Sequence, residues 1–202
     1  MKPYYQDSHC TIYHADCMDV LPHLEPVDLV LTDPPYGLGI SSNPVRQLHE
    51  KQDWDSAPVD AELLSVCMDA GREQIVWGGN YFGLPAHQCF LVWNKHQPQD
   101  FSLAMCEQAW TSLKMPAKLF SRSVRYLKEH PTEKPIELMR WCIEMCSGEP
   151  STILDPFMGS GTTLRAAKDL GRKAIGIEIE EKYCEIAAKR LAQEVLPFDA
   201  VG

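Results

Sequence analysis

The stretch Asp28-Leu29-Val30-Leu31-Thr32-Asp33-Pro34-Pro35-Tyr36-Gly37 decides the fold that we expect for this chain. Its apolar half suits a strand that is buried on both faces of a parallel sheet. The two prolines fix their own φ angles, remove two backbone donors and bias Asp33 and Pro34 towards extended conformation. The stretch therefore predicts a rigid loop at the carboxyl end of a strand, where open α/β sheets bind their ligands. A carboxylate, a phenol ring and free carbonyls in this loop could hold a flat, amino-bearing ring.

Strands and helices are expected to alternate on both sides of this stretch. The expected strands are 11–14, 74–77, 89–93, 151–154 and 173–179, and the expected helices are 17–24, 61–71, 136–146, 163–170 and 181–195. Residues 103–121 predict a strand pair around Ala109 and Leu119. This alternation predicts an α/β fold with a parallel or mostly parallel sheet that helices cover on both sides.

The totals predict one domain, residues 1–202, with a well-buried core. No apolar run approaches the roughly 20 residues that span a bilayer, and the start of the chain is not a signal peptide. Eight cysteines without a repeated close spacing predict a reducing cytoplasm rather than a disulfide framework. Cys142 and Cys146 would share a helix face, but we expect no metal site because a second pair is lacking.

The charge distribution leaves two alternatives open. A net charge of −9 argues mildly against a nucleic-acid partner, although the distribution matters more than the sum. Residues 108–128 contain no acidic residue, and five basic residues fall there: Lys114, Lys118, Arg122, Arg125 and Lys128. This stretch is either a solvated basic surface or a surface for phosphates.

A second landmark is the stretch 153–163, which predicts a strand, a tight glycine turn and a helix start. Gly159 and Gly161 permit positive φ and let a ligand approach the backbone closely. A dinucleotide fingerprint would need glycine where this chain has Leu164. Glu178, at the end of the next expected strand, is placed to accept hydrogen bonds from ribose hydroxyls. The turn therefore predicts a nucleoside cofactor, unless the glycines only form a turn and Glu178 is a surface acid.

Three stretches together resemble the DNA amino-methyltransferases that use S-adenosylmethionine. DPPY at 33–36 is similar to the family's catalytic motif, HPTEKP at 130–135 to a segment before its cofactor motif, and DPFMGSGTT at 155–163 to the cofactor motif. The catalytic motif comes first here, and this permuted order resembles the beta group of the family. The resemblance covers residues 11–191, and residues 74–82 are also similar to phage-associated members.

The resemblance implies a fold, a cofactor and site residues. The fold is a Rossmann-like sheet of seven strands, mostly parallel with one reversed, with helices on both faces. The cofactor is S-adenosylmethionine: Asp16 would contact its adenine, Glu178 its ribose, and Thr132 and Lys134 its methionine end. Lys134 offers a cation for the methionine carboxylate but would equally suit an ordinary salt bridge. The other implied cofactor-binding residues are Asp33, Asp155, Phe157, Gly159, Ser160, Gly161 and Thr162.

Catalysis is expected at Asp33, Pro34 and Tyr36. The Asp33 carboxylate and the Pro34 carbonyl can accept the two hydrogens of an exocyclic amino group, which exposes the lone pair of its nitrogen. Positioning and electrostatics should supply most of the rate. Tyr36 would stack on a base that is flipped out of the duplex. The alternative is that Asp33 only forms a turn and Tyr36 is a half-buried core ring.

The expected substrate is adenine in double-stranded DNA, methylated at N6. Aspartate at position 33, where the family more often carries serine for cytosine, favours adenine; N4 methylation of cytosine stays open. Methylation of a ring carbon is disfavoured because it needs a Pro-Cys pair, which does not occur here. A non-catalytic relative that binds DNA or senses the cofactor is another alternative, whereas Leu164 argues against a nicotinamide enzyme.

The DNA is expected to contact two insertions, residues 38–58 and 96–129, because the chain has no room for a separate large target-recognition domain. The expected DNA-binding residues are Arg46, Lys51, Lys118, Arg122 and Arg125, whose charges suit phosphate contacts. So little recognition surface implies a short target or a homodimer that shares the duplex. We expect a cytoplasmic, bacterial or phage-encoded methylase, with or without a restriction partner.

Overall fold

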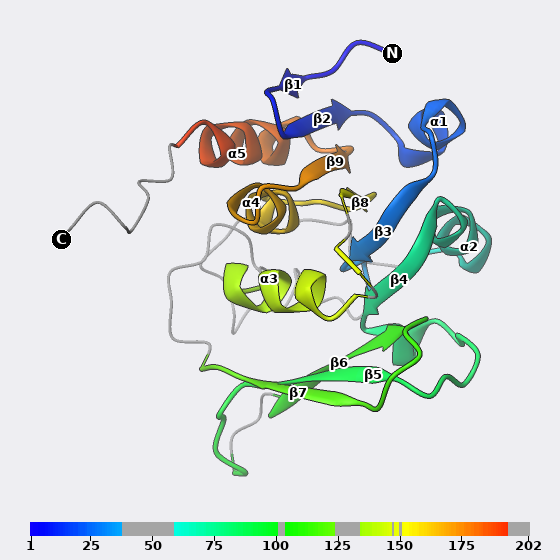
Figure 1. Ribbon diagram of the computed structural model, residues 1–202, viewed down its shortest axis with the longest axis vertical. Coiled ribbons are helices and arrows are strands. Elements are labelled where there is room, and N and C mark those ends of the chain that lie inside the picture. Colours follow the sequence, from blue (N-terminus) through cyan, green and yellow to red (C-terminus); the bar gives the residue numbers. More distant parts are fainter. Residues whose placement is uncertain (38–58, 101–103, 124–133, 147, 150, 194–202) are drawn as a thin grey trace, which may run out of the picture.

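The computed structural model describes residues 1–37, 59–100, 104–123, 134–146, 148–149 and 151–193. Within them the strands form one nine-stranded sheet with the order β1-β2-β9-β8-β3-β4-β6-β5-β7 (Figure 1). The strands are β1 Tyr5–Gln6, β2 Cys10–His14, β3 Val27–Thr32, β4 Gly71–Trp77, β5 Phe90–Asn94, β6 Cys106–Thr111, β7 Lys118–Ser121, β8 Thr152–Asp155 and β9 Lys173–Glu178. The helices are α1 Cys17–Val20, α2 Ala61–Asp69, α3 Ile136–Glu144, α4 Thr162–Asp169 and α5 Glu181–Ala192, with 3-10 turns η1 Leu21–His23 and η4 Gly79–Tyr81.

The expected mostly parallel α/β sheet is confirmed. The seven strands from β2 to β5 in the sheet order form its body, and β6 is the reversed strand, antiparallel to both β4 and β5. Two further strands extend the edges beyond the seven expected. β1 adds a short antiparallel pairing to β2, and β7 runs parallel to β5.

The strands expected around Ala109 and Leu119 are confirmed, but their expected pairing with each other is wrong. Both strands form, but β5 lies between them, so Ala109 is opposite Leu91 and Leu119 is opposite Val92. Leu91 is fully buried, whereas Leu119 is exposed. The edge of a sheet suits the more polar and exposed strand, because only one side of an edge strand has a pairing partner. β7 therefore takes the edge, and β5 takes the interior.

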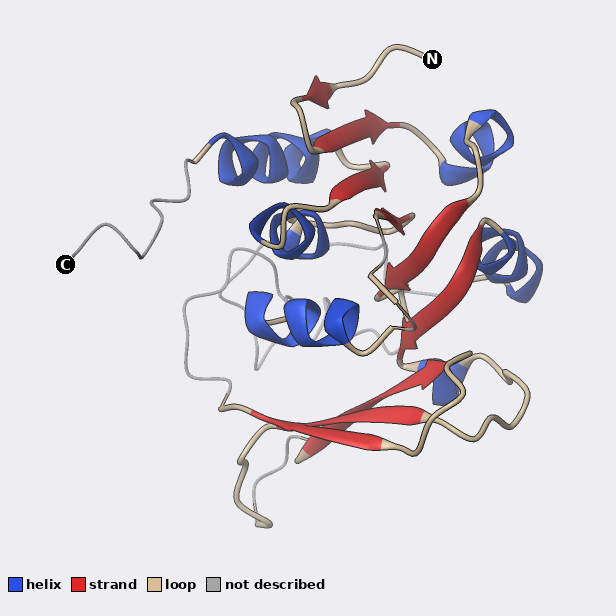
Figure 2. Cartoon of the chain, in the orientation of Figure 1, coloured by secondary structure: helices blue, strands red, loops and turns tan. Residues whose placement is uncertain are grey.

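Two layers of helices cover the sheet (Figure 2). α3, α4 and α5 cover one face and contact one another in sequence, while α1 and α2 cover the other. Leu29 and Leu31 belong to the larger core on the side of α3, α4 and α5, and Val30 belongs to the smaller core beneath α1 and α2. Alternate residues of β3 thus face opposite cores, which explains why the whole run is apolar.

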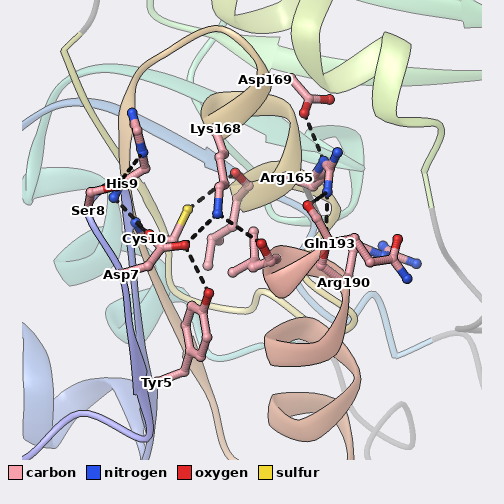
Figure 3. A network of polar contacts seen from close by, with 12 residues as sticks. Tyr5, Asp7, Ser8, His9, Cys10, Arg165, Lys168, Asp169, Arg190 and Gln193 are labelled. Carbon is pink, nitrogen blue, oxygen red and sulfur yellow. Dashed lines mark hydrogen bonds and ion pairs between the residues drawn. The ribbon is translucent and has the colours of Figure 1, made fainter. Parts of the chain in front are cut away.

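A polar network ties the start of the chain to α4 and to the end of α5 (Figure 3). The Lys168 ammonium donates to Asp7 Oδ2 at 2.5 Å and to the Leu191 carbonyl at 2.9 Å. Asp7 also accepts from the Tyr5 hydroxyl. Burial raises the pKa of Asp7, but the Lys168 ammonium and two backbone donors more than offset this and hold it well below its usual range. Ionised Asp7 therefore helps to hold α4, whose first residue follows the glycine turn.

Candidate cofactor and base site

A cavity of about 290 Å³ lies where β2, β3, β8 and β9 end. Its lining combines carboxylates, small residues of the glycine turn and apolar side chains. The expected cofactor residues that line it are Asp16, Asp33, Lys134, Asp155, Phe157, Gly159, Ser160, Thr162 and Glu178. The carboxyl ends of neighbouring parallel strands are where open α/β sheets bind ligands. The tertiary structure thus brings together residues from positions 16 to 178 of the sequence.

The lining also contains residues that were not among the expected cofactor residues, four of them inside the quoted motifs. They are Ala15, Cys17, Pro35, Leu63, Met139, Pro156, Met158, Thr163, Ile177, Ile179, Glu180 and Tyr183. Leu63 comes from α2 and Met139 from α3, so the cavity is closed from both helical layers of the sheet. The signal of Leu63 and Met139 in the sequence is only that of core-facing helical positions, which is shared by many residues that line no site.

Asp155 links the two strands that carry the motifs. Its Oδ1 accepts from the Thr32 hydroxyl at 2.9 Å and from the Phe157 backbone N–H at 3.2 Å. The side chain is almost fully buried. Burial raises its pKa to about 7, against hydrogen bonds from Thr163 and Thr32 that lower it. A carboxyl in this state can change its charge when a cation enters the cavity.

Glu178 supports the glycine turn. Its Oε2 accepts from the Gly159 N–H and its Oε1 from the Glu180 N–H, each at 2.9 Å. Burial raises the pKa of this carboxyl. Because each carboxylate oxygen has two lone pairs, Glu178 keeps acceptor sites for a ligand hydroxyl while it supports the turn. Asp16, in turn, accepts from the Met18 N–H and caps α1.

Gly161 differs from the other expected cofactor residues. It does not line the cavity. It precedes α4 with φ of 78°, and a Cβ at this position would lie 2.7 Å from the Ala187 Cβ in α5. The glycine is therefore required for the left-handed turn and for the close packing of α4 on α5. Local sequence showed the turn but not the helix packed against it.

The loop after β3 places Asp33 between two donors. Tyr36 donates its hydroxyl to Asp33 Oδ1, and the Lys134 ammonium lies 2.5 Å from Asp33 Oδ2. The same ammonium is 3.3 Å from the Tyr36 oxygen. Burial raises the pKa of Asp33, and Lys134 opposes that rise. The pKa of Tyr36 is raised well above its usual value by burial and by the Asp33 charge, so its hydroxyl stays a donor.

Lys134 has two carboxylate partners. Besides Asp33, it lies 3.0 Å from Glu107 Oε2, and Glu107 Oε1 pairs with Lys95. The motifs indicated neither Glu107 nor Lys95, because they lie in β6 and directly after β5, far from any motif in sequence. Lys134 was expected to offer its charge to a methionine carboxylate. Here its charge is shared by two protein carboxylates, although its side chain still lines the cavity.

Aromatic rings surround Tyr36. The Tyr81 ring stacks on it at a centroid distance of 5.1 Å, and the Phe82 ring meets it edge-on at 6.1 Å. Gly78, with φ of 67°, lies directly beside the ring. Tyr81 is about half exposed, so this stack reaches the surface. The break in the strand pattern after Trp77 was the only signal of this arrangement in the sequence.

The expected DNA-binding residues lie away from the cavity lining or outside the described residues. Lys118 is exposed on β7, and Arg122, directly after β7, pairs with Glu137 at the start of α3. The remaining expected positions lie outside the described residues: Arg46, Lys51, Arg125 and, for the cofactor, Thr132. Pro34 is buried in the loop, but the neighbouring Pro35 is the proline that lines the cavity.

Two classes of feature are absent from the parts of the chain that the structure describes. No three or more His, Cys, Asp or Glu side chains are grouped so as to hold a metal ion. No helix in those parts is long and apolar enough to cross a membrane.

Comparison with known proteins places the chain in a family. The family model for DNA methylases matches residues 85–189. The chain is 30% identical to the putative methylase YubD of Escherichia coli, with 88% of each covered. It is 28% identical to the type II methyltransferase M2.LlaDCHI of Lactococcus lactis, covering 94% of this chain and 92% of the relative.

Solved structures share the fold. The crystal structure of the M1.HpyAVI-SAM complex matches with a TM-score of 0.64 at 24% identity, covering 91% of this chain and all of that one. The PvuII DNA methyltransferase, described as cytosine-N4-specific, matches with a TM-score of 0.65 at 16% identity, covering 97% and 91%. On the family model and on the relatives that cover most of its length, this chain belongs to the DNA methylase family.

Proposed function

We propose that this methylase transfers a methyl group from S-adenosylmethionine to the N6 amino group of an adenine flipped out of double-stranded DNA. The observation that carries the proposal is the position of Asp33. Its carboxylate lines the cavity next to Asp155 and the glycine turn, and it belongs to the same short loop as Tyr36. The acceptor proposed for the amino group therefore lies in the lining of a cavity that is large enough for a nucleoside.

The residues that line the cavity fit S-adenosylmethionine. Asp16, Glu178 and Glu180 offer acceptors for the hydroxyls and amines of a nucleoside, and Phe157 and Ile177 offer apolar surface for its base. Asp33 and Asp155 add negative charge for a cationic centre. When bound, the cofactor supplies an activated methyl group on a sulfonium. The protein's task is then to place an amino nitrogen in line with that group, which is chiefly a matter of positioning.

Asp33 and the Pro34 carbonyl would accept the two amino hydrogens of the base. The amino lone pair is delocalised into the ring, and hydrogen bonds to both hydrogens favour a pyramidal nitrogen with an exposed lone pair. Asp33 already accepts from Tyr36 and Lys134, but its two oxygens have four acceptor sites. Flipping the base out of the duplex costs a few kcal/mol, which stacking on the Tyr36 ring, at about 1–3 kcal/mol, would offset.

Adenine is favoured over cytosine by the aspartate at position 33. N4 methylation of cytosine is the second candidate, because one enzyme of the same fold is described as cytosine-N4-specific and the same loop would hold either amino group. Incubation of the protein with methyl-labelled cofactor and duplex DNA, followed by nucleoside analysis, distinguishes the two. N6-methyladenine is the expected product, and label in N4-methylcytosine would refute the assignment.

Asp33→Ala tests the proposed role of Asp33 separately from cofactor binding. We expect transfer to be lost, while the cofactor dissociation constant, measured by titration calorimetry, changes little. Asp69→Ala is a matched control, because Asp69 is exposed at the end of α2 that precedes the amino end of β4, the opposite end of the sheet from the cavity. A loss of cofactor affinity as large as the loss of transfer would contradict the role given to Asp33.

The whole chain would act as one catalytic domain, with DNA contacted by residues 38–58 and 96–129. Two of the expected DNA-binding residues lie in the described part of the second segment: Lys118 is in β7, and Arg122 directly follows it. Replacing Arg122 and Arg125 by glutamine should weaken duplex binding and lower the slope of log K against log salt by about 1–2 units. An unchanged slope would place the DNA elsewhere.

A further inference from the structure

Four charged side chains form an alternating chain behind the catalytic loop. Lys95 pairs with Glu107, Glu107 lies 3.0 Å from Lys134, and Lys134 lies 2.5 Å from Asp33. The four come from different parts of the sequence. Asp33 follows β3, Lys95 follows β5, Glu107 is in β6, and Lys134 precedes α3. Only the reversed strand β6 brings Glu107 to this position.

This chain of charges is largely removed from water. The side chain of Lys134 is 5% exposed, that of Lys95 15%, that of Asp33 20% and that of Glu107 26%. Removing one partner of such a pair leaves an uncompensated buried charge, which is strongly unfavourable. Two ammonium groups and two carboxylates balance one another here. Glu107 lies between the two ammonium groups and pairs with both, so Lys134 has a second carboxylate partner besides Asp33.

We infer that Glu107, held by Lys95, is a positioning residue for methyl transfer: it holds the Lys134 ammonium against Asp33 and remains its counter-ion when Asp33 takes a proton. The inference rests on the proposed function, in which Asp33 receives the amino group of the base. Glu107 does not line the cavity, so it acts through Lys134 rather than on a substrate.

The charge balance of the reaction explains the need for this counter-ion. The amino nitrogen forms a bond to the methyl carbon while the carbon–sulfur bond breaks and its electron pair stays on sulfur. The methylated nitrogen, now cationic, releases one proton to the Asp33 carboxylate. Asp33 thereby loses its charge, and without Glu107 the Lys134 ammonium would be left as a buried cation with no carboxylate partner. The Glu107 carboxylate keeps it paired until Asp33 passes the proton to solvent.

The charges around Asp33 support this division of roles. Burial raises the pKa of Asp33, Lys134 lowers it and Glu107 raises it, with Tyr36 also donating to it. Asp155 lies close enough to interact with the Asp33 charge. Burial also raises the pKa of Glu107, but Lys134 and Lys95 outweigh this and lower it to about 2. Asp33 is thus suited to accept a proton, while Glu107 stays ionised.

Two substitutions should shift the titration of Asp33 in opposite directions. Glu107→Gln removes a negative neighbour, so the acid limb of the kcat profile should move to lower pH. Lys134→Met removes a positive neighbour, so the limb should move to higher pH. In Glu107→Gln, kcat should also fall about 10²-fold from misplacement of the ammonium, with the KM for cofactor unchanged. Glu185→Gln, in an exposed ion pair on α5, is the matched control and should change neither kcat nor the pH of the acid limb.

A second measurement does not depend on turnover. The side-chain ¹³C signal of Asp33, assigned by its loss in Asp33→Asn, reports the ionisation of this carboxyl directly. The pH at the midpoint of its titration should be lower in Glu107→Gln and higher in Lys134→Met than in the wild type. If Glu107→Gln does not fold, Lys95→Met tests the same chain of charges from its other end. This variant removes a cation and leaves Glu107 charged, so the pH midpoint of Asp33 should move up, and an unchanged midpoint would overturn the coupling of Lys95 and Glu107 to Asp33.

The outcomes separate this inference from the proposed function. Equal shifts in both variants, or no shift in Glu107→Gln, would overturn the role of Glu107 even if the wild type methylates adenine. Opposite shifts together with label in cytosine would support Glu107 and refute only the choice of base. A loss of kcat in Glu107→Gln at every pH without a shift would indicate a structural role alone, and would also overturn the inference.

Discussion

Replacing Asp155 with asparagine should remove a pH-dependent loss of stability. Asp155 is almost fully buried at the end of β8, and burial raises its pKa from 3.8 to about 7. The folded state therefore binds this proton more tightly than the unfolded chain does. As the pH rises above 3.8, the unfolded state ionises first, so the free energy of unfolding falls until the folded group also ionises near pH 7.

The size of the effect follows from the shift. A rise from 3.8 to about 7 is about three pKa units, which corresponds to about 4 kcal/mol over the whole range at about 1.4 kcal/mol per unit. Between pH 5 and pH 8, integration of the linkage relation gives about 2.5 kcal/mol. Asparagine carries no charge, and its oxygen can still accept from Thr32 and Phe157, because both donate to the same Asp155 oxygen.

Urea unfolding at pH 5 and pH 8 measures the effect as a difference between wild type and Asp155→Asn. Between pH 5 and pH 8, the free energy of unfolding of the wild type should fall by about 2.5 kcal/mol more than that of the variant. Asp28→Asn is the matched control. Hydrogen bonds from Ser151 and Thr152 lower the pKa of Asp28 to about 2. The contribution of Asp28 to the free energy of unfolding is therefore lost only in acid and should not change between pH 5 and pH 8. If the free energies of unfolding of the wild type and of Asp155→Asn changed equally between pH 5 and pH 8, the role given to Asp155 would be refuted.

Two further substitutions test the surroundings of the site. Gly78→Ala should cost about 1–3 kcal/mol of unfolding free energy and slow turnover, because φ is 67° and a Cβ would lie 2.2 Å from the Tyr36 ring; wild-type stability and rate would contradict this. Lys168→Met should lower the unfolding free energy by about 1–3 kcal/mol at neutral pH. Because the pKa of Asp7 is held below 3.8, the difference from wild type in urea unfolding should narrow as the pH falls through that value, and a constant difference would argue against the ion pair.

The elements next to a strong local signal were predictable from the sequence. The apolar run of β3 ends at the proline pair, and β8 ends at a glycine turn, so the loops that carry Asp33 and Asp155 could be placed at strand ends. Both loops line the cavity. Residues 103–121 lacked such a signal, and there the expected pairing was wrong, because neighbouring strands in a sheet need not be neighbours in sequence.

The sequence by itself determined which strand ends carry the chemistry, because prolines and glycines act through local backbone geometry. Only the tertiary structure decided the long-range pairings. β5 lies between β6 and β7 because β7, the most exposed of the three strands, takes the edge. Gly161 serves the packing of α4 on α5, and Glu107 reaches Lys134 through the reversed strand β6. These contacts depend on how distant segments pack, and no local pattern encodes that.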